Sequence, residues 1–260
     1  MLSESERNTV VEALLEANRT KIQTTRPSAL YPHIEFDDSY AISAEVARRT
    51  IESGGKLIGY KVGLTSLAMR RSSKIDEPDF GYVYQHFLHP DGATLKHANY
   101  CVPRVELELA FVLKDALQGP NVSLLDVMRA TEYIVPSIEL IDARVDEPRK
   151  IYDTIADNGA GAGLILGGRP VRPHDVDLRL VPGILYRNAE IEETGVSCGV
   201  MGHPANAIAW LANKLHDISV HLHPGQILLA GSSVRPVWAQ PGDTIRADFA
   251  DLGSVSIRFE

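Results

Sequence analysis

Short apolar runs dominate the chain after residue 55, and they constrain its fold more than any other feature of the sequence. Each run is apolar or alternates apolar with polar residues, and each is bounded by Gly, Pro, Asn or Asp, as β-strands are. The runs do not alternate regularly with helical segments, which argues against a doubly wound nucleotide-binding fold and a barrel of eight βα units. The sequence therefore predicts an α+β protein that is mainly β. The predicted strands cover residues 56–63, 105–113, 134–141, 163–167, 184–191, 226–230, 244–249 and 254–259.

The N-terminal segment has a helical pattern instead. Ser3 and Glu6 have the spacing of a capping box, and apolar residues at helical spacing follow until the break at Pro27. A second helix is predicted from about Asp37 to Gly54. No repeat or linker is evident, so we expect one domain over residues 1–260, with a helical layer over about 1–55 and a strand-rich body over about 56–260. Shorter helices are predicted in that body after Ser123, near Asp153 and over residues 204–216.

Composition limits the class of protein and of partner. The chain has 260 residues, 44% of them hydrophobic and 23% charged, which is typical of a globular protein. Its net charge of −8 disfavours nucleic acid and anionic membranes as partners, although a small anionic substrate stays possible. No apolar run approaches the roughly 20 residues of a membrane helix, and the start has no signal-peptide pattern. We expect a soluble cytoplasmic protein, in which the widely separated Cys101 and Cys198 stay reduced.

The most informative segment covers residues 105–113. Every odd position is large and apolar, so a strand here places Glu106 and Glu108 side by side on its other face, about 7 Å apart. That face continues with Ala110 and Val112, which suggests that it is not open to solvent along its whole length. Two carboxylates in a partly enclosed site repel each other and need a compensating cation.

A third carboxylate has a similar setting, because Glu139 lies within an otherwise apolar predicted strand. A hard divalent cation such as Mg²⁺ or Mn²⁺ binds carboxylate oxygens and keeps positions for water or substrate oxygens. The pattern alone leaves a second interpretation open. Glu106 and Glu108 can line a solvated strand face while Glu139 pairs with an Arg or Lys.

Two further residues are candidates for the same site. Lys61 lies in a glycine-flanked apolar run and could hold an anion or move a proton, or simply occupy a strand face. Asp79 could act on a proton or belong to a turn. The glycines at 159, 161 and 163 precede a predicted strand and lack the GxGxxG spacing, so no dinucleotide site is indicated. The P-loop, HExxH and GxSxG signatures are absent, and His203 is interpreted as a helix-start residue.

Together, several ordered segments resemble the hydratase and decarboxylase branch of the fumarylacetoacetate hydrolase superfamily. The resemblance implies the mixed β-sandwich or roll of that superfamily's C-terminal domain, and it implies that Glu106, Glu108 and Glu139 hold Mg²⁺ or Mn²⁺. It also implies that Lys61 lies in the substrate pocket. The segments that carry it are GYKVGLTS (59–66), EPDFG (77–81), RVELELAF (104–111), PSIE (136–139), DTIADN (153–158), GHP (202–204) and GSVS (253–256).

The resemblance also implies a reaction. A 2-hydroxy-2,4-dienoate ketonises to a 2-oxo-enoate and adds water, giving a 4-hydroxy-2-oxo acid, with Lys61 at the oxo-acid end and Asp79 handling protons. Sister enzymes decarboxylate a 2-oxo-hexenedioate (4-oxalocrotonate), but they tend to have Ile at the position of Asp79, which favours hydration here. A non-catalytic protein that binds a cation on the same scaffold is an alternative of another class.

The substrate's length is a separate question. The branch that this chain resembles most hydrates the seven-carbon diacid 2-oxo-hept-4-ene-1,7-dioate, whereas the alternative is the monoacid 2-hydroxypenta-2,4-dienoate. A second carboxylate needs a nearby cation, for which Arg144, Arg149, Lys150 and Arg235 are candidates, with Ser232 as a further substrate-binding residue. The superfamily commonly forms rings, so we also expect a homo-oligomer.

Overall fold

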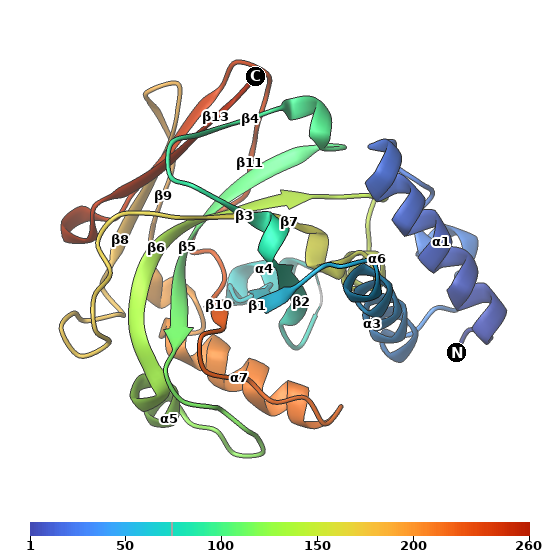
Figure 1. Cartoon of the computed structure of the whole chain (residues 1–260), viewed down its shortest axis with the longest axis horizontal. Helices are drawn as coiled ribbons and strands as arrows, with labels where there is room; N and C mark the ends of the chain where they lie inside the picture. The colour runs from blue at the N-terminus through green and yellow to red at the C-terminus, as the bar shows by residue number, and fades with distance from the viewer. Residues whose placement is uncertain (74) are drawn as a thin grey trace.

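The computed structural model describes residues 1–73 and 75–260, without the side chains of residues 69, 72 and 73. In these residues the strands form two sheets that pack face to face, with helices α1 (Glu4–Thr20) and α3 (Phe36–Glu52) at the far side of the larger sheet (Figure 1). The chain is therefore an α+β protein with a helical N-terminal layer, as the sequence predicts. Among the described residues, none of the helices has the length and apolar character needed to cross a membrane.

The larger sheet has the strand order β2-β1-β10-β5-β6-β7-β3, and β11 pairs with β5. Its centre is the long antiparallel pair of β5 and β6, which curves through the molecule (Figure 1). The strands are β1 (Leu57–Gly63), β2 (Asp79–Tyr84), β3 (Leu88–His89), β5 (Pro103–Leu113), β6 (Thr131–Asp142), β7 (Gly161–Leu166), β10 (Ile227–Leu229) and β11 (Val237–Trp238).

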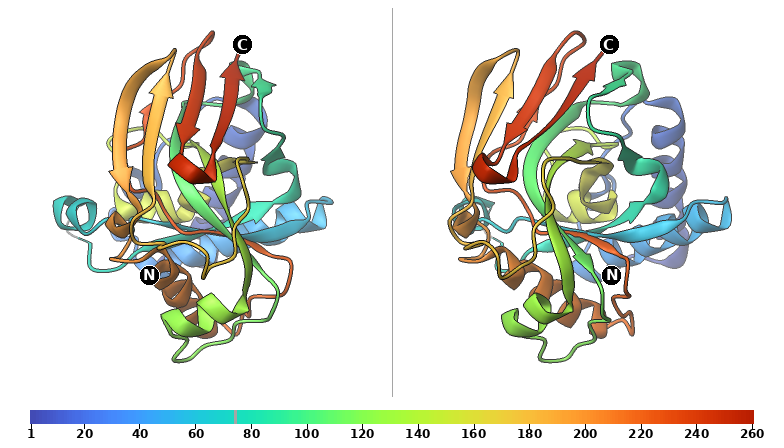
Figure 2. Two further views of the ribbon diagram at one scale, coloured as in Figure 1. Left: turned by 90° about the vertical axis from the view of Figure 1, so that its left-hand side faces the viewer. Right: turned by 60° about the vertical axis from the view of Figure 1, so that its left-hand side comes forward.

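The smaller sheet has the order β4-β13-β12-β8-β9 and stands beside β5 and β6 (Figure 2). The alternation in β5 explains the packing, because its odd residues, such as Leu107 and Phe111, are buried in one core with Leu185 and Ile257 of the smaller sheet. The even face of β5 is thereby left for the site. The strands are β4 (Ala93–Leu95), β8 (Pro182–Arg187), β9 (Glu190–Val196), β12 (Thr244–Asp248) and β13 (Ser254–Phe259).

The helices begin where the capping signals predict. Ser3 and Glu6 form a reciprocal capping box at α1, Ser123 and Asp126 form another at α5, and the His203 side chain accepts a hydrogen bond from the backbone of Ala205 at the start of α7. Helices α1 and α3 pack against each other, as do α5 and α7 (Figure 1). The bounds are α1 (Glu4–Thr20), α2 (Pro27–Leu30), α3 (Phe36–Glu52), α4 (Leu67–Ser73), α5 (Leu124–Ala130), α6 (Ile151–Ala156) and α7 (Pro204–His216).

Two local predictions differ from the structure. The single strand predicted over 184–191 is wrong, because the chain turns between β8 and β9 at Asn188 and Ala189, whose φ angles are 54° and 67°. Two consecutive left-handed residues are the geometry of a tight hairpin turn. The turn considered for Asp79 is also absent, since Asp79 is the first residue of β2 and pairs with Gly63 of β1.

Candidate active site

The β5–β6 register brings the predicted metal ligands together. Glu106 lies directly opposite Glu139, and Glu108 lies opposite Ser137, one cross-strand pair further along. Side chains of such pairs share a face of the sheet, so the three carboxylates project to the same side. One ligand oxygen from each lies within 4.8 Å of the others.

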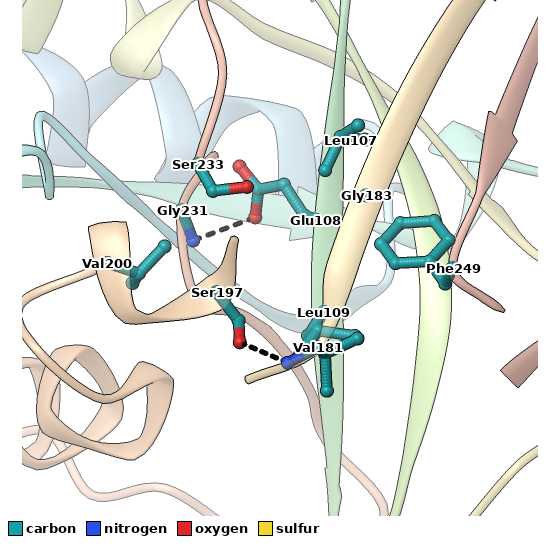
Figure 3. A pocket seen from close by; sticks show the side chains of 10 residues that line it. All are labelled: Leu107, Glu108, Leu109, Val181, Gly183, Ser197, Val200, Gly231, Ser233 and Phe249. Carbon is teal, nitrogen blue, oxygen red and sulfur yellow. Dashed lines mark hydrogen bonds between the residues drawn. The ribbon is translucent and has the colours of Figure 1, made fainter. Parts of the chain in front are cut away.

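The carboxylate cluster has too few partners for its charge. The backbone N–H of Gly231 donates to Glu108 Oε2 at 2.8 Å (Figure 3), but Glu108 Oε1 and Glu139 Oε2 are buried and without a hydrogen-bond partner. Burial and then the Glu139 carboxylate raise the pKa of Glu106 to about 7, and burial likewise raises the pKa of Glu108. Three converging oxygen donors with orphaned atoms fit a hard divalent cation, which supplies the missing positive charge.

Lys61 of β1 is buried beside this cluster. Its ammonium donates to the Gly159 carbonyl at 2.7 Å and lies 3.3 Å from Glu139 Oε1. Burial lowers the pKa of Lys61, but the carboxylates of Glu139 and Asp79 outweigh it and raise the pKa, so the side chain is charged. Gly159 has a φ of 59°, and a Cβ atom there would lie 3.2 Å from Lys61 Nζ. The glycine therefore permits the ammonium to approach the backbone, with a third N–H left to donate.

Asp79 is the other buried acid of the site. It is 1% exposed, and its Oδ1 atom has no hydrogen-bond partner. Burial raises the pKa of Asp79, and the Lys61 ammonium opposes that rise. Gly63 allows the close approach, because a Cβ atom at Gly63 would lie 2.0 Å from Asp79 Oδ1. The carboxyl group is thus held in a dry position from which it can exchange a proton.

One cavity of about 160 Å³ connects these groups. Lys61, Asp79 and Glu106 line it, together with Ser232, a predicted substrate-binding residue. Glu106 is only partly buried, so the carboxylate cluster opens into the cavity. Arg235, a candidate partner of a second substrate carboxylate, also lines it, as do polar side chains without a predicted role: Thr65, Ser66, Arg104 and Thr154.

Arg144 and Arg149 are placed differently, since neither lines this cavity. The Arg144 guanidinium is buried, donates to Asp157 Oδ1 and to its backbone oxygen, and also reaches the Gly161 carbonyl. Arg149 contacts Glu147 at 2.6 Å. The structure therefore gives both arginines protein partners, and their contact with substrate stays a prediction.

A second, smaller cavity borders β5 at Glu108 and its neighbours Leu107 and Leu109, and Gly231 also lines it. Figure 3 shows that it is surrounded mainly by apolar side chains, among them Leu107, Leu109 and Phe249. Its volume is about 10 Å³, which is room for about one water molecule. We assign no ligand to it.

Arg104 is the functional candidate that the sequence interpretation missed. Arg104, Glu106 and Glu108 are alternate residues of β5, and alternate residues of a strand project from the same face. This spacing could have identified Arg104 as a residue of the site. Thr154, by contrast, reaches the cavity from helix α6, and no local pattern indicates that placement.

The fold and the acidic site define a class of proteins. Residues 62–260 match the fumarylacetoacetate (FAA) hydrolase C-terminal family, and the chain belongs to this family. It is 48% identical over 257 residues to the 2-oxo-hept-4-ene-1,7-dioate hydratase of Escherichia coli, covering 96% of each chain. It is 36% identical over 230 residues to the 4-oxalocrotonate decarboxylase of Pseudomonas putida, covering 88% of this chain and 87% of the relative.

A solved structure agrees over the full length. The 4-oxalocrotonate decarboxylase of Pseudomonas putida G7, complexed with magnesium and adipate, superposes with a TM-score of 0.96 at 31% identity. The comparison covers 100% of this chain and 99% of that one. The helical N-terminal layer, which precedes the family match, is therefore shared with that protein.

Proposed function

We propose that the protein is a divalent-metal-dependent hydratase that acts on 2-oxo-hept-4-ene-1,7-dioate and yields a 4-hydroxy-2-oxo diacid. One observation carries the proposal: the carboxylates of Glu106, Glu108 and Glu139 converge, and Glu106 lines one cavity with the buried ammonium of Lys61 and the buried carboxyl group of Asp79. The similarity to a hydratase of that substrate supports it, and the magnesium and adipate bound to the structural relative support a cation and a dicarboxylate.

The three glutamates would hold Mg²⁺ or Mn²⁺, which when bound supplies Lewis-acid stabilisation of negative charge at the substrate's 2-oxygen. Lys61 binds and orients the anionic oxo-acid end through its remaining N–H donor. Asp79 holds or moves the proton that the dienol and the added water exchange, because its Oδ1 atom is free of protein partners. Ser232 offers a hydroxyl at the same cavity, although that hydroxyl also donates to the Val234 carbonyl.

Two alternatives are less well supported. Decarboxylation of 4-oxalocrotonate needs no proton acceptor at the position of Asp79, and an anionic Asp79 facing the reacting carbons would oppose a carboxylate at the position where decarboxylases need the leaving one. A purely structural cation would have a closed coordination shell. Glu106 instead faces a cavity with room for further ligands.

The test is a substrate panel with the purified full-length chain. The protein is stripped with EDTA, reloaded with Mg²⁺, and given the seven-carbon dienol diacid, 2-hydroxypenta-2,4-dienoate or 4-oxalocrotonate. We expect a hydrated product from the diacid, no carbon dioxide, and no turnover without metal. Stoichiometric carbon dioxide from 4-oxalocrotonate with no hydrated product from any dienol would reassign the chain as a decarboxylase. No turnover of any of the three would contradict an enzymatic role.

A cytoplasmic homo-oligomer is part of the same proposal. The small-molecule substrate is supported by the activity of the relatives, whereas the assembly and the location stay predictions. Light scattering of the purified chain measures the assembly directly.

A further inference from the structure

Arg104 projects from the same face of β5 as the metal ligands. It precedes Glu106 by two residues, which places it about 7 Å further along the strand. It lines the cavity together with Ile141, Thr154 and Arg235. The side chain therefore borders the same cavity as Glu106, further along β5 than the carboxylate cluster.

Within the described part of the chain, the guanidinium of Arg104 has no counter-ion. No described side chain or backbone group makes a hydrogen bond or an ion pair with it, and its Nε atom is buried without a partner. Its Cζ atom lies 5.0 Å from the centre of the Trp238 ring. Trp238 of β11 is the direct cross-strand neighbour of Arg104, so the ring lies against the guanidinium from the adjacent strand.

The neighbouring cations all have acidic partners. Arg144 is paired with Asp157, Arg149 with Glu147 and Arg235 with Glu193. Lys61 is held by Glu139. Among the cationic side chains that line the cavity in the described part of the chain, Arg104 is thus the one without an acidic partner. A partly buried, unpaired guanidinium is costly, and an anionic ligand removes that cost.

We propose that Arg104 binds the distal carboxylate of a dicarboxylic substrate and so determines the preference for a diacid. The inference rests on the proposed function for the identity of the oxo-acid end. A planar guanidinium held on an aromatic ring presents two parallel N–H donors, which match a carboxylate. Trp238 is then a positioning residue, since it touches the arginine and not the substrate.

A different role for Arg104 would be to balance the charge of Glu106. That role predicts that metal binding changes when Arg104 is replaced, whatever the length of the organic ligand. Recognition of a distal carboxylate predicts instead an effect that depends on the second carboxylate alone. The two roles are therefore separable by a matched pair of ligands.

The experiment uses 2-oxoheptanedioate and 2-oxoheptanoate, which have the same oxo-acid end and carbon number and cannot be hydrated. Their affinities for the Mg²⁺-loaded protein are measured by calorimetry, together with the affinity for Mg²⁺ alone. We expect Arg104→Met to weaken the diacid roughly 10- to 100-fold and to leave the monoacid and Mg²⁺ within about 2-fold. Arg104→Lys is expected to restore part of the diacid affinity, because lysine keeps the positive charge but lacks the two parallel N–H donors of a guanidinium.

Arg246→Met is the matched control. Arg246 also stacks on an aromatic ring, with Cζ 4.8 Å from the Tyr186 ring centre, but it lies in the smaller sheet and does not line the cavity. We expect this variant to bind both ligands as the unmodified chain does. Equal weakening of both ligands by Arg104→Met, a loss of Mg²⁺ affinity, or no change at all would overturn the assignment.

The same ligands separate this inference from the proposed function. A selective loss of diacid affinity in Arg104→Met would support the role of Arg104 whether or not the unmodified protein hydrates a dienol. If the unmodified protein hydrates no dienol, that result contradicts only the hydratase assignment. In the kinetic assay of an active chain, we expect Arg104→Met to raise KM for the seven-carbon dienol diacid and to leave 2-hydroxypenta-2,4-dienoate nearly unchanged.

Discussion

Glu106 and Glu139 face each other as a directly opposed pair of the antiparallel strands β5 and β6. Like charges in such a pair destabilise a sheet. The register nevertheless places both acids on the face that carries Glu108, and no arginine pairs with any of the three in the described residues. Lys61 supplies one positive charge beside Glu139, so a cation bound by the three carboxylates would supply the charge that the fold does not.

The first prediction concerns metal and stability. We expect Mg²⁺ to raise the Tm of the EDTA-treated protein, because it binds the folded chain and relieves the repulsion; saturation at 100 times the Kd gives about 2.7 kcal/mol. Glu106→Gln removes one charge, so the metal-free variant is expected to be at least as stable as the metal-free parent while losing the response to Mg²⁺. Thermal unfolding followed by circular dichroism measures both effects.

Glu132→Gln is the control for that prediction. Glu132 lies in the same strand as Glu139, but it is exposed and belongs to no carboxylate cluster. Its Mg²⁺ response is expected to match the parent. A Glu106→Gln protein that keeps the full Mg²⁺ response would show that Glu106 is not a ligand.

The second prediction concerns Lys61. Lys61→Met keeps an apolar stem but removes the ammonium that contacts Glu139 Oε1 and the Gly159 carbonyl. We expect a raised KM and a lower kcat for the dienol, with Mg²⁺ affinity retained, because the lost charge acts on the anionic substrate. Steady-state kinetics and calorimetry are the measurements. Unchanged kcat and KM would show that the Lys61 ammonium does not act on the substrate and that Lys61 is an ordinary strand residue.

The third prediction concerns Asp79. Asp79→Ile is expected to lower the hydration rate by at least the roughly 10²-fold of a lost acid–base group, and Asp79→Asn by a similar amount, since neither exchanges a proton. Substrate binding is measured beside turnover. Asp79→Asn keeps the size of the side chain, so full activity in this variant would remove Asp79 from the proton-transfer role.

The sequence predicts the local parts of this structure well and the long-range parts less well. The Ser3–Glu6 capping box and the alternation in β5 are fixed by neighbours in the sequence, and both are confirmed. The opposition of Glu106 and Glu139 depends on the register of two distant strands, which no local pattern specifies. The prediction that the three glutamates converge came from the resemblance to a known family and not from their spacing in the sequence.

The fourth prediction concerns Gly159. An alanine there is strained by the φ of 59° and brings a Cβ atom to 3.0 Å from Lys61 Cε. Gly92→Ala is the matched control, because Gly92 has a φ of 76° but no atom near its added Cβ. We expect similar losses of stability in the two variants, on the order of 1 kcal/mol, and a loss of activity in Gly159→Ala alone. Equal activities of Gly159→Ala and Gly92→Ala would show that displacing the Lys61 ammonium does not affect catalysis.

The last prediction separates the structural role of Arg144 from a role in substrate binding. Its guanidinium is buried against Asp157, with Nη1 donating to the Gly161 carbonyl at 3.1 Å and Nη2 to the Asp157 carbonyl at 2.8 Å. Arg144→Met leaves the Asp157 carboxylate buried without a counter-ion, which costs about 3–5 kcal/mol. We expect a Tm lower by roughly 10 °C and, at a temperature where the variant is folded, an unchanged ratio of diacid to monoacid affinity. A selective loss of diacid affinity would instead place Arg144 in contact with the distal carboxylate.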